Sequence, residues 1–214
     1  MDKKQIEKEI KDLVKDLKLN NKQLNKVLKL SAYLVEVGDL EQAEELLIRS
    51  LTNFPGEKDL RYNLGNVYFM ASKYDKASEI FQKLIQDDYG FEAFFMQAKT
   101  LDEQGNKQMA IVYALTATEK NPEDIAGLEL MADLLLSNGN FNESMNYYEK
   151  ANAIKPSAKY YFNMALCAMN LNQKYQSYLN KSKELDEKYY LKNEKKLSNL
   201  QQFLTKTGDS DDRK

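Results

Sequence analysis

The segment Arg61-Tyr62-Asn63-Leu64-Gly65-Asn66-Val67-Tyr68, followed by Tyr74, Ala77 and Phe81, carries the pattern on which the whole fold depends. Ala77 belongs to a column of small residues that recurs at intervals of 34, 33, 34 and 33 residues: Ala43, Ala77, Ala110, Ser144 and Ser177. The same four intervals separate a column of turn residues: Gly38, Ser72, Gly105, Gly139 and Asn172. A fixed period of this length predicts stacked structural repeats.

Each repeat is predicted to be a pair of antiparallel helices joined by a short turn. In the first half of the second repeat, the apolar residues fall at helical spacing on one face: Leu60, Leu64, Val67 and Tyr68. The second half has the same spacing, with Ala77, Ile80, Phe81 and Leu84. Small residues such as Gly65 and Ala77 allow the two helices to approach closely, so a bulky side chain at Gly65 should force the pair apart.

These residues resemble the tetratricopeptide repeat, which has a period of about 34 residues and the order Leu-Gly-x-x-Tyr, Ala-x-x-x-Phe and Pro. The resemblance implies an all-α, right-handed α-solenoid of about five helix-turn-helix units. The predicted units are 24–57, 58–90, 91–124, 125–157 and 158–191. The last unit departs from the pattern at Lys181 and Glu184, so it is either a degenerate end cap or half a repeat.

Segments at both ends are predicted to cover the array. Residues 1–23 read as an N-terminal capping helix, because Ile6, Ile10 and Leu13 share one helical face. A docking or dimerising amphipathic helix is the alternative for this segment. Residues 192–205 are predicted to form a C-terminal capping helix, and residues 206–214 a disordered tail.

The composition argues against catalysis. The chain has no histidine and one cysteine, which excludes histidine-based nucleophile pairs and thiolate metal cages. Glu129 and Asp133 share the spacing of a carboxylate pair, but such pairs are abundant among 33 acidic residues. No phosphate-binding loop or calcium loop is present. We therefore expect no enzyme, no cofactor and no metal site, and Cys167 is predicted to be a small core residue.

Charge is unevenly distributed along the chain. Residues 1–29 and 158–214 each carry a net charge of +4, whereas residues 30–157 carry −10. The acidic centre argues against nucleic-acid binding and favours a cationic partner. No apolar run approaches the ~20 residues of a membrane span, and the N-terminus lacks a signal peptide. These features predict a cytoplasmic protein without membrane insertion, and the Lys- and Asn-rich usage suggests a bacterial one.

The resemblance also implies where a partner would bind. Such solenoids hold a peptide or a partner helix on the concave face, which is lined by the first helix of every unit. The positions that usually face this groove, with one neighbouring asparagine, predict a partner-binding set in this sequence: Tyr62, Asn63, Asn66, Phe69, Met70, Phe95, Lys99, Asp102, Glu103, Glu129, Asp133, Phe162, Leu166 and Met169.

Each part of this set has a plainer interpretation. The large apolar residues are either groove residues or packing against the next helix, and the asparagines either bind a partner backbone or are simply exposed. The acidic residues either attract a basic segment or form a solvated face. The carboxylate clamp of one repeat subtype is absent, since Leu28 and Ala32 occupy its polar positions. Recognition of an Hsp90-type tail is therefore not expected.

We expect a non-enzymatic scaffold or adaptor that binds another protein through a basic or amphipathic segment. One alternative is a self-assembling structural protein in which the basic ends meet the acidic middle of a neighbour. Another is a secretion or assembly chaperone.

Overall fold

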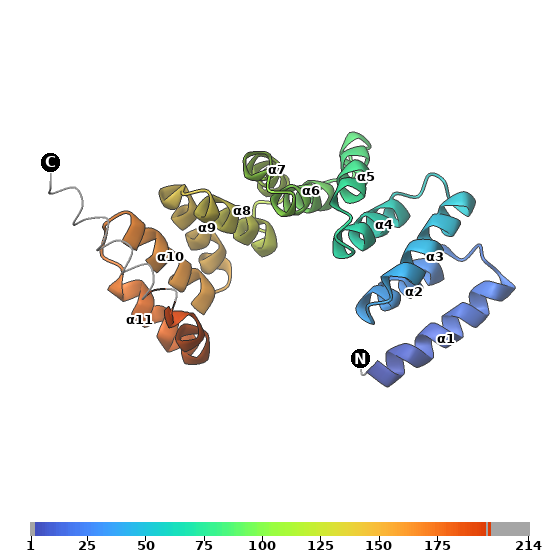
Figure 1. The fold of residues 1–214 in the computed structure, drawn as a ribbon, viewed down its shortest axis with the longest axis horizontal. Helices are drawn as coiled ribbons and strands as arrows, with labels where there is room; N and C mark the ends of the chain where they lie inside the picture. The colour runs from blue at the N-terminus through green and yellow to red at the C-terminus, as the bar shows by residue number, and fades with distance from the viewer. Residues whose placement is uncertain (1–2, 196, 198–214) are drawn as a thin grey trace. The chain divides into compact units, whose positions relative to one another are not determined.

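The computed structural model describes residues 3–195 and 197, and every regular element in this part of the chain is an α-helix (Figure 1). The predicted all-α repeat class is therefore confirmed. The chain divides into two compact units, Met1–Lys120 and Asn121–Lys214, which are described separately. None of the described helices is long and apolar enough to cross a membrane.

The first unit, Met1–Lys120, consists of helices that each pack against the next helix in sequence. Their bounds are α1 (Lys3–Leu19), α2 (Leu24–Glu36), α3 (Leu40–Asn53), α4 (Lys58–Met70), α5 (Tyr74–Gln86), α6 (Phe91–Glu103) and α7 (Lys107–Lys120). In addition, α2 contacts α4 and α4 contacts α6. The first helices of the successive pairs thus form one layer in this unit.

Left-handed residues end the first helix of each pair. Gly38, Ser72 and Gly105 have φ angles of 84°, 56° and 79°. After Gly38, the Asp39 N–H donates to the Leu34 carbonyl oxygen at 2.8 Å, which caps α2 from outside the helix. The repeated turn column in the sequence therefore marks a backbone conformation that glycine adopts most easily.

The core of this unit lies between the paired helices. Leu47, Leu60, Phe81 and Leu84 are fully buried there. Gly65 is the close-contact position predicted from the sequence, since a Cβ built on it would lie 2.7 Å from the Cε1 atom of Phe81. The small residue is required because the Phe81 ring occupies the space beside the α4 backbone.

The second unit, Asn121–Lys214, repeats the arrangement with two helix pairs. Its helices are α8 (Ile125–Ser137), α9 (Phe141–Ile154), α10 (Ala158–Asn170) and α11 (Gln176–Leu185). A further helical segment begins at residue 187 and continues to residue 195. The predicted boundary between residues 191 and 192 falls inside this segment. Apart from residues 192–195 and 197, the predicted capping helix and the tail lie outside the described residues.

The last helix pair departs from the predicted register. The turn between α10 and α11 spans residues 171–175, whereas the corresponding turn after α2 spans residues 37–39. The two extra residues shift the buried column, so Ser177 is exposed and Leu179 is buried in its place. Lys181 and Glu184 are accordingly exposed and form an ion pair at 2.9 Å.

Candidate partner-binding site

The predicted residues of the first unit gather on two neighbouring helices, α4 and α6. Three of them recur at helical spacing on α4 (Tyr62, Asn66, Phe69), and three on α6 (Phe95, Lys99, Asp102). Residues spaced by four and three positions lie on the same side of a helix. Because α4 contacts α6, the two sets form one surface, and all six side chains are half-buried.

A lysine joins the two helices at the centre of this surface. The Lys99 ammonium lies 5.3 Å from the centroid of the Phe69 ring and 5.6 Å from that of the Phe95 ring. Both distances are within the range of cation–π attraction. Among the residues that the structure describes, no carboxylate forms an ion pair with Lys99. This geometry thus pairs the Lys99 ammonium with the two rings rather than with a carboxylate.

The surface continues over Tyr62. This ring stacks on Tyr89 with the centroids 5.2 Å apart, and it forms a T-shaped pair with Phe81 with the centroids 6.1 Å apart. Burial raises the pKa of the Tyr62 hydroxyl above its usual value, so Tyr62 stays neutral at physiological pH. Nearby, the Oδ1 atom of Asn66 is buried and accepts no hydrogen bond from the described residues. This acceptor lies beneath the surface rather than on it, because the atom is buried.

The structure gives the other predicted residues of this unit different roles. Met70 is exposed, with 52% of its surface accessible. The Asn63 amide nitrogen donates to the Ser31 hydroxyl oxygen at 3.4 Å, so this side chain links α4 to α2. Glu103 is exposed and accepts a hydrogen bond from the Tyr74 hydroxyl at 3.2 Å.

Two predicted acidic residues of the second unit share one lysine of the same chain. The Lys159 ammonium lies 2.5 Å from a carboxylate oxygen of Glu129 and 2.7 Å from one of Asp133. The Tyr160 hydroxyl also donates to Glu129, at 2.6 Å, and the Tyr148 hydroxyl donates to Asp133. This arrangement lowers the negative charge that is available to the basic segment suggested by the sequence, because one ammonium already pairs with both carboxylates.

The pKa values in this cluster follow from the same contacts. Burial alone would raise the pKa of Glu129, but its hydrogen bonds from Lys159 and Tyr160 hold it below the usual value. Burial likewise opposes the charged form of Lys159, yet its two carboxylate partners raise its pKa. We attribute a structural role to the cluster, because its charged groups are occupied by one another.

The predicted apolar residues of the second unit belong to its core. Phe162 and Met169 are 1% and 4% exposed, and Leu166 is half-buried against the same cluster. Leu197 and Tyr189, from the segment after α11, complete this cluster. The sequence-based assignment of Phe162 and Met169 to a partner surface is therefore wrong, because later parts of the same chain cover them.

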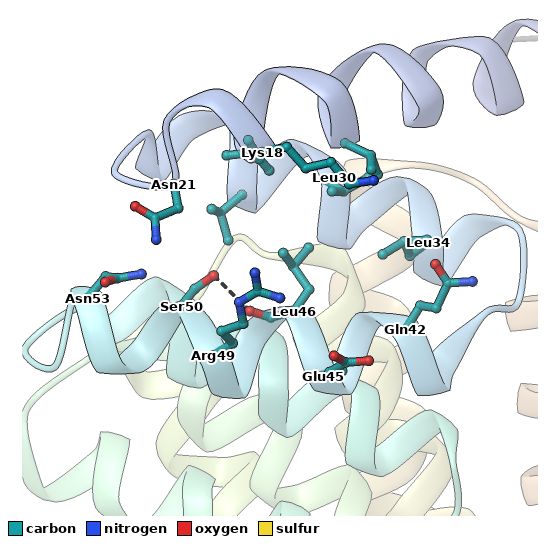
Figure 2. A pocket seen from close by; sticks show the side chains of 13 residues that line it. Lys18, Asn21, Leu30, Leu34, Gln42, Glu45, Leu46, Arg49, Ser50 and Asn53 are labelled. Carbon is teal, nitrogen blue, oxygen red and sulfur yellow. Dashed lines mark hydrogen bonds between the residues drawn. The ribbon is translucent and has the colours of Figure 1, made fainter.

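Sequence reasoning missed a pocket between α1, α2 and α3 (Figure 2). It encloses about 200 Å³. Leu30, Leu34 and Leu46 contribute to its apolar wall, and Lys18 and Arg49 lie at its edge (Figure 2). The only sequence signal was the apolar face of residues 1–23, which packs incompletely on the first helix pair.

Chemically reactive groups are scarce in the described part of the chain. Cys167 is fully buried, and burial raises the pKa of its thiol, which disfavours the reactive thiolate. No cluster of three or more carboxylate or thiol ligands that could hold a metal ion occurs among the described residues. The candidate site is therefore a surface for contact, formed by Tyr62, Asn66, Phe69, Phe95 and Lys99, which we name the α4–α6 face.

Comparison with known proteins agrees with this architecture. Residues 34–99 and residues 127–157 each match the tetratricopeptide repeat family. No curated protein matches the sequence. Similar solved structures include YrrB, a tetratricopeptide repeat protein with an unusual peptide-binding site, at a TM-score of 0.68 and 20% identity over 86% of this chain and 97% of that chain.

Two further structures show the same fold. The MamA protein has a TM-score of 0.67 and 21% identity over 76% of this chain and 91% of that chain. A thermophilic repeat protein of Thermus thermophilus has a TM-score of 0.60 and 14% identity over 78% of this chain and 93% of that chain. The sequence period, the paired helices and the two family matches agree, so residues 34–99 and 127–157 of this chain are tetratricopeptide repeats.

Proposed function

We propose that this chain is a non-enzymatic interaction module that binds a segment of another protein on the α4–α6 face. The observation that carries the proposal is the position of the Lys99 ammonium over the rings of Phe69 and Phe95. A side chain needed only for the core would be apolar and covered. Here a cation and two half-buried rings from neighbouring helices present one mixed surface.

The chemistry of this face indicates the kind of segment that would fit. Covering half-buried aromatic rings with a partner removes their remaining apolar surface from water, which favours binding. A carboxylate of the partner would pair with Lys99, which has no acidic partner among the described residues. The expected partner is thus an amphipathic peptide or helix that carries an acidic residue beside apolar ones.

This proposal revises the charge expected of the partner. Asp102 and Glu103 remain on or near this side of α6, but Glu129 and Asp133 are occupied by Lys159. Support for a peptide-like partner also comes from YrrB, a structural relative that is described as having a peptide-binding site. Interaction with another protein is the general role of tetratricopeptide repeats.

The proposal can be tested by selecting binders from a displayed library of random peptides. We expect wild-type protein to enrich peptides that combine apolar and acidic residues. Lys99→Ala should weaken a selected peptide by about 5-fold, which corresponds to ~1 kcal/mol for one partly exposed charged contact. Titration calorimetry with the synthetic peptide measures this change.

A matched control is available on another helix. Lys76 lies 5.1 Å from the centroid of the Tyr68 ring, so it makes the same type of contact away from the α4–α6 face. Lys76→Ala should leave peptide affinity unchanged. Equal loss of affinity in the Lys76 and Lys99 variants, or peptides that bind the Phe69→Ala/Phe95→Ala double variant as well as wild type, would refute the proposal.

A further inference from the structure

Helix α7 exposes an apolar stripe on its outer side. Met109, Val112 and Leu115 are 43%, 54% and 39% exposed. They recur every three residues, so they share one side of the helix. Large apolar side chains that are exposed singly are ordinary, but three on one helix face are typical of an interaction surface.

The other second helices of the pairs are polar at the equivalent positions. At the equivalent repeat positions, the exposed residues are Gln42, Glu45 and Ile48 on α3, Lys76, Glu79 and Gln82 on α5, and Glu143, Asn146 and Glu149 on α9. Only Ile48 among these nine is apolar. The segment that contains α7 also lies between the two family matches, at residues 34–99 and 127–157. Helix α7 therefore departs from the repeat pattern on its outer side.

The inner side of α7 shows the opposite departure. It presents mainly small residues to the core, since Ala110, Ala114, Ala117 and Thr118 are its buried residues. The corresponding inner residues of α5 are Ala77, Phe81 and Leu84. In α7 the small residues thus lie inside and the large apolar ones outside. Packing in the core of this unit therefore does not account for the apolar character of Met109, Val112 and Leu115.

The ends of the stripe are polar and complementary to each other. Gln108 and Glu119 lie on the same side of α7 as Val112, and both are exposed. The structure shows no hydrogen bond or ion pair for either side chain within the described part of the chain. One end therefore offers an amide donor, and the other end offers a carboxylate acceptor.

We propose that this stripe is a self-association surface on which α7 packs antiparallel against α7 of a second copy of the chain. A two-fold axis at the middle of Lys107–Lys120 places Val112 opposite Leu115 of the other copy. The same axis places Gln108 opposite Glu119 of the other copy. Each contact then occurs twice, and each donor meets an acceptor. A second copy satisfies both ends of the stripe at once, as an isologous interface requires.

The small area of the α7 stripe limits the affinity of the proposed dimer. A single pair of helices buries less than the ~1,200 Å² of the smallest standard interfaces, so the dimer should be weak and form at micromolar or higher concentration. The α4–α6 face takes no part in this contact, so failure of either proposal leaves the other unaffected.

Sedimentation equilibrium of the full chain over a range of concentrations tests the proposal. The wild-type mass should rise from 24.8 kDa toward twice that value as the concentration increases. Val112→Glu should weaken the dimer at least about 10-fold, because it places two like charges in a small apolar contact. Ile48→Glu is the matched control, since Ile48 is 47% exposed on the outer side of α3, and it should dimerise like wild type.

A second pair of variants tests the orientation. Gln108→Lys should tighten the dimer several-fold at low salt, because each new lysine faces Glu119 of the other copy, and Gln108→Glu should weaken it. Circular dichroism should show unchanged helix content in all variants. A wild-type chain that stays at the monomer mass at every concentration, an equal effect of Ile48→Glu and Val112→Glu, or a weaker dimer with Gln108→Lys would each overturn the proposal.

Discussion

Substitution of Gly65 by alanine should destabilise the first unit even though alanine favours helices. A Cβ at this position would lie 2.7 and 2.9 Å from Cε1 and Cζ of Phe81, and 3.1 Å from Cγ2 of Ile80. The Phe81 ring is fully buried and touches the edge of Tyr62, so it cannot withdraw into solvent. Overpacking of this kind costs ~1–3 kcal/mol.

The gain in helix propensity offsets part of that cost. Replacing a helical glycine by alanine is worth ~1 kcal/mol. Because the new Cβ would lie less than 3.0 Å from two atoms of the buried Phe81 ring, we expect the overpacking cost to be near the upper end of the range given above. We therefore expect Gly65→Ala to lower the free energy of unfolding by about 1–2 kcal/mol.

Urea unfolding followed by circular dichroism measures this change, and a second-site variant tests its cause. Phe81→Leu removes the ring carbons that the new methyl group meets, so the two substitutions together should cost at least about 0.5 kcal/mol less than the sum of the single ones. Gly56→Ala is the control, because its Cβ would meet nothing within 4 Å. A neutral or stabilising Gly65→Ala, or full additivity with Phe81→Leu, would refute the packing argument.

Three other outcomes are expected. The Phe69→Ala/Phe95→Ala double variant should lose peptide binding and also about 2–4 kcal/mol of stability, measured by urea unfolding, because both rings are half-buried against the core. Despite burial, the contact with Lys159 holds the pKa of folded Glu129 below its usual value of 4.5, so this contact should stabilise the second unit above about pH 4.5. The stabilisation should be lost as the pH falls through the lowered pKa, and Glu129→Gln should flatten the stability–pH profile in this acidic range. Ser72 has a φ of 56°, a conformation that glycine adopts more easily than serine, so Ser72→Gly should raise the free energy of unfolding by up to ~1 kcal/mol. A lower thermal midpoint of the variant would contradict this.

Much of the fold could be predicted because the repeat pattern is local. The spacing of small and apolar residues predicted the helix pairs, and Gly65 marked the closest approach of α4 and α5. The register of α11 could not be predicted in the same way. Its shift comes from the length of the turn at residues 171–175, and Ser177 matches the expected column in sequence without being buried. A column of residue types does not reveal where a helix begins.

The candidate site could be predicted from the sequence only where its residues contact one another on the first helices of neighbouring repeats. Phe95 and Lys99 on α6 hold the repeat positions of Tyr62 and Asn66 on the neighbouring first helix α4, and this repetition predicted the surface. Phe162 has the same repeat position as Phe95, but the segment after α11 buries it. The ion pair between Glu129 and Lys159 joins adjacent repeats across 30 residues of sequence, which the i, i+4 spacing of Glu129 and Asp133 on a single helix does not show.

The burial of Cys167 gives this chain a natural reporter of motion in its second unit. The thiol is the only one in the sequence and has no accessible surface. A thiol reagent can therefore react only after α10 separates from its neighbours, so the labelling rate at low reagent concentration measures how often the second unit opens. The first unit contains no cysteine and contributes nothing to that signal. Comparing this rate with global unfolding would show whether the second unit opens alone or only when the whole chain unfolds.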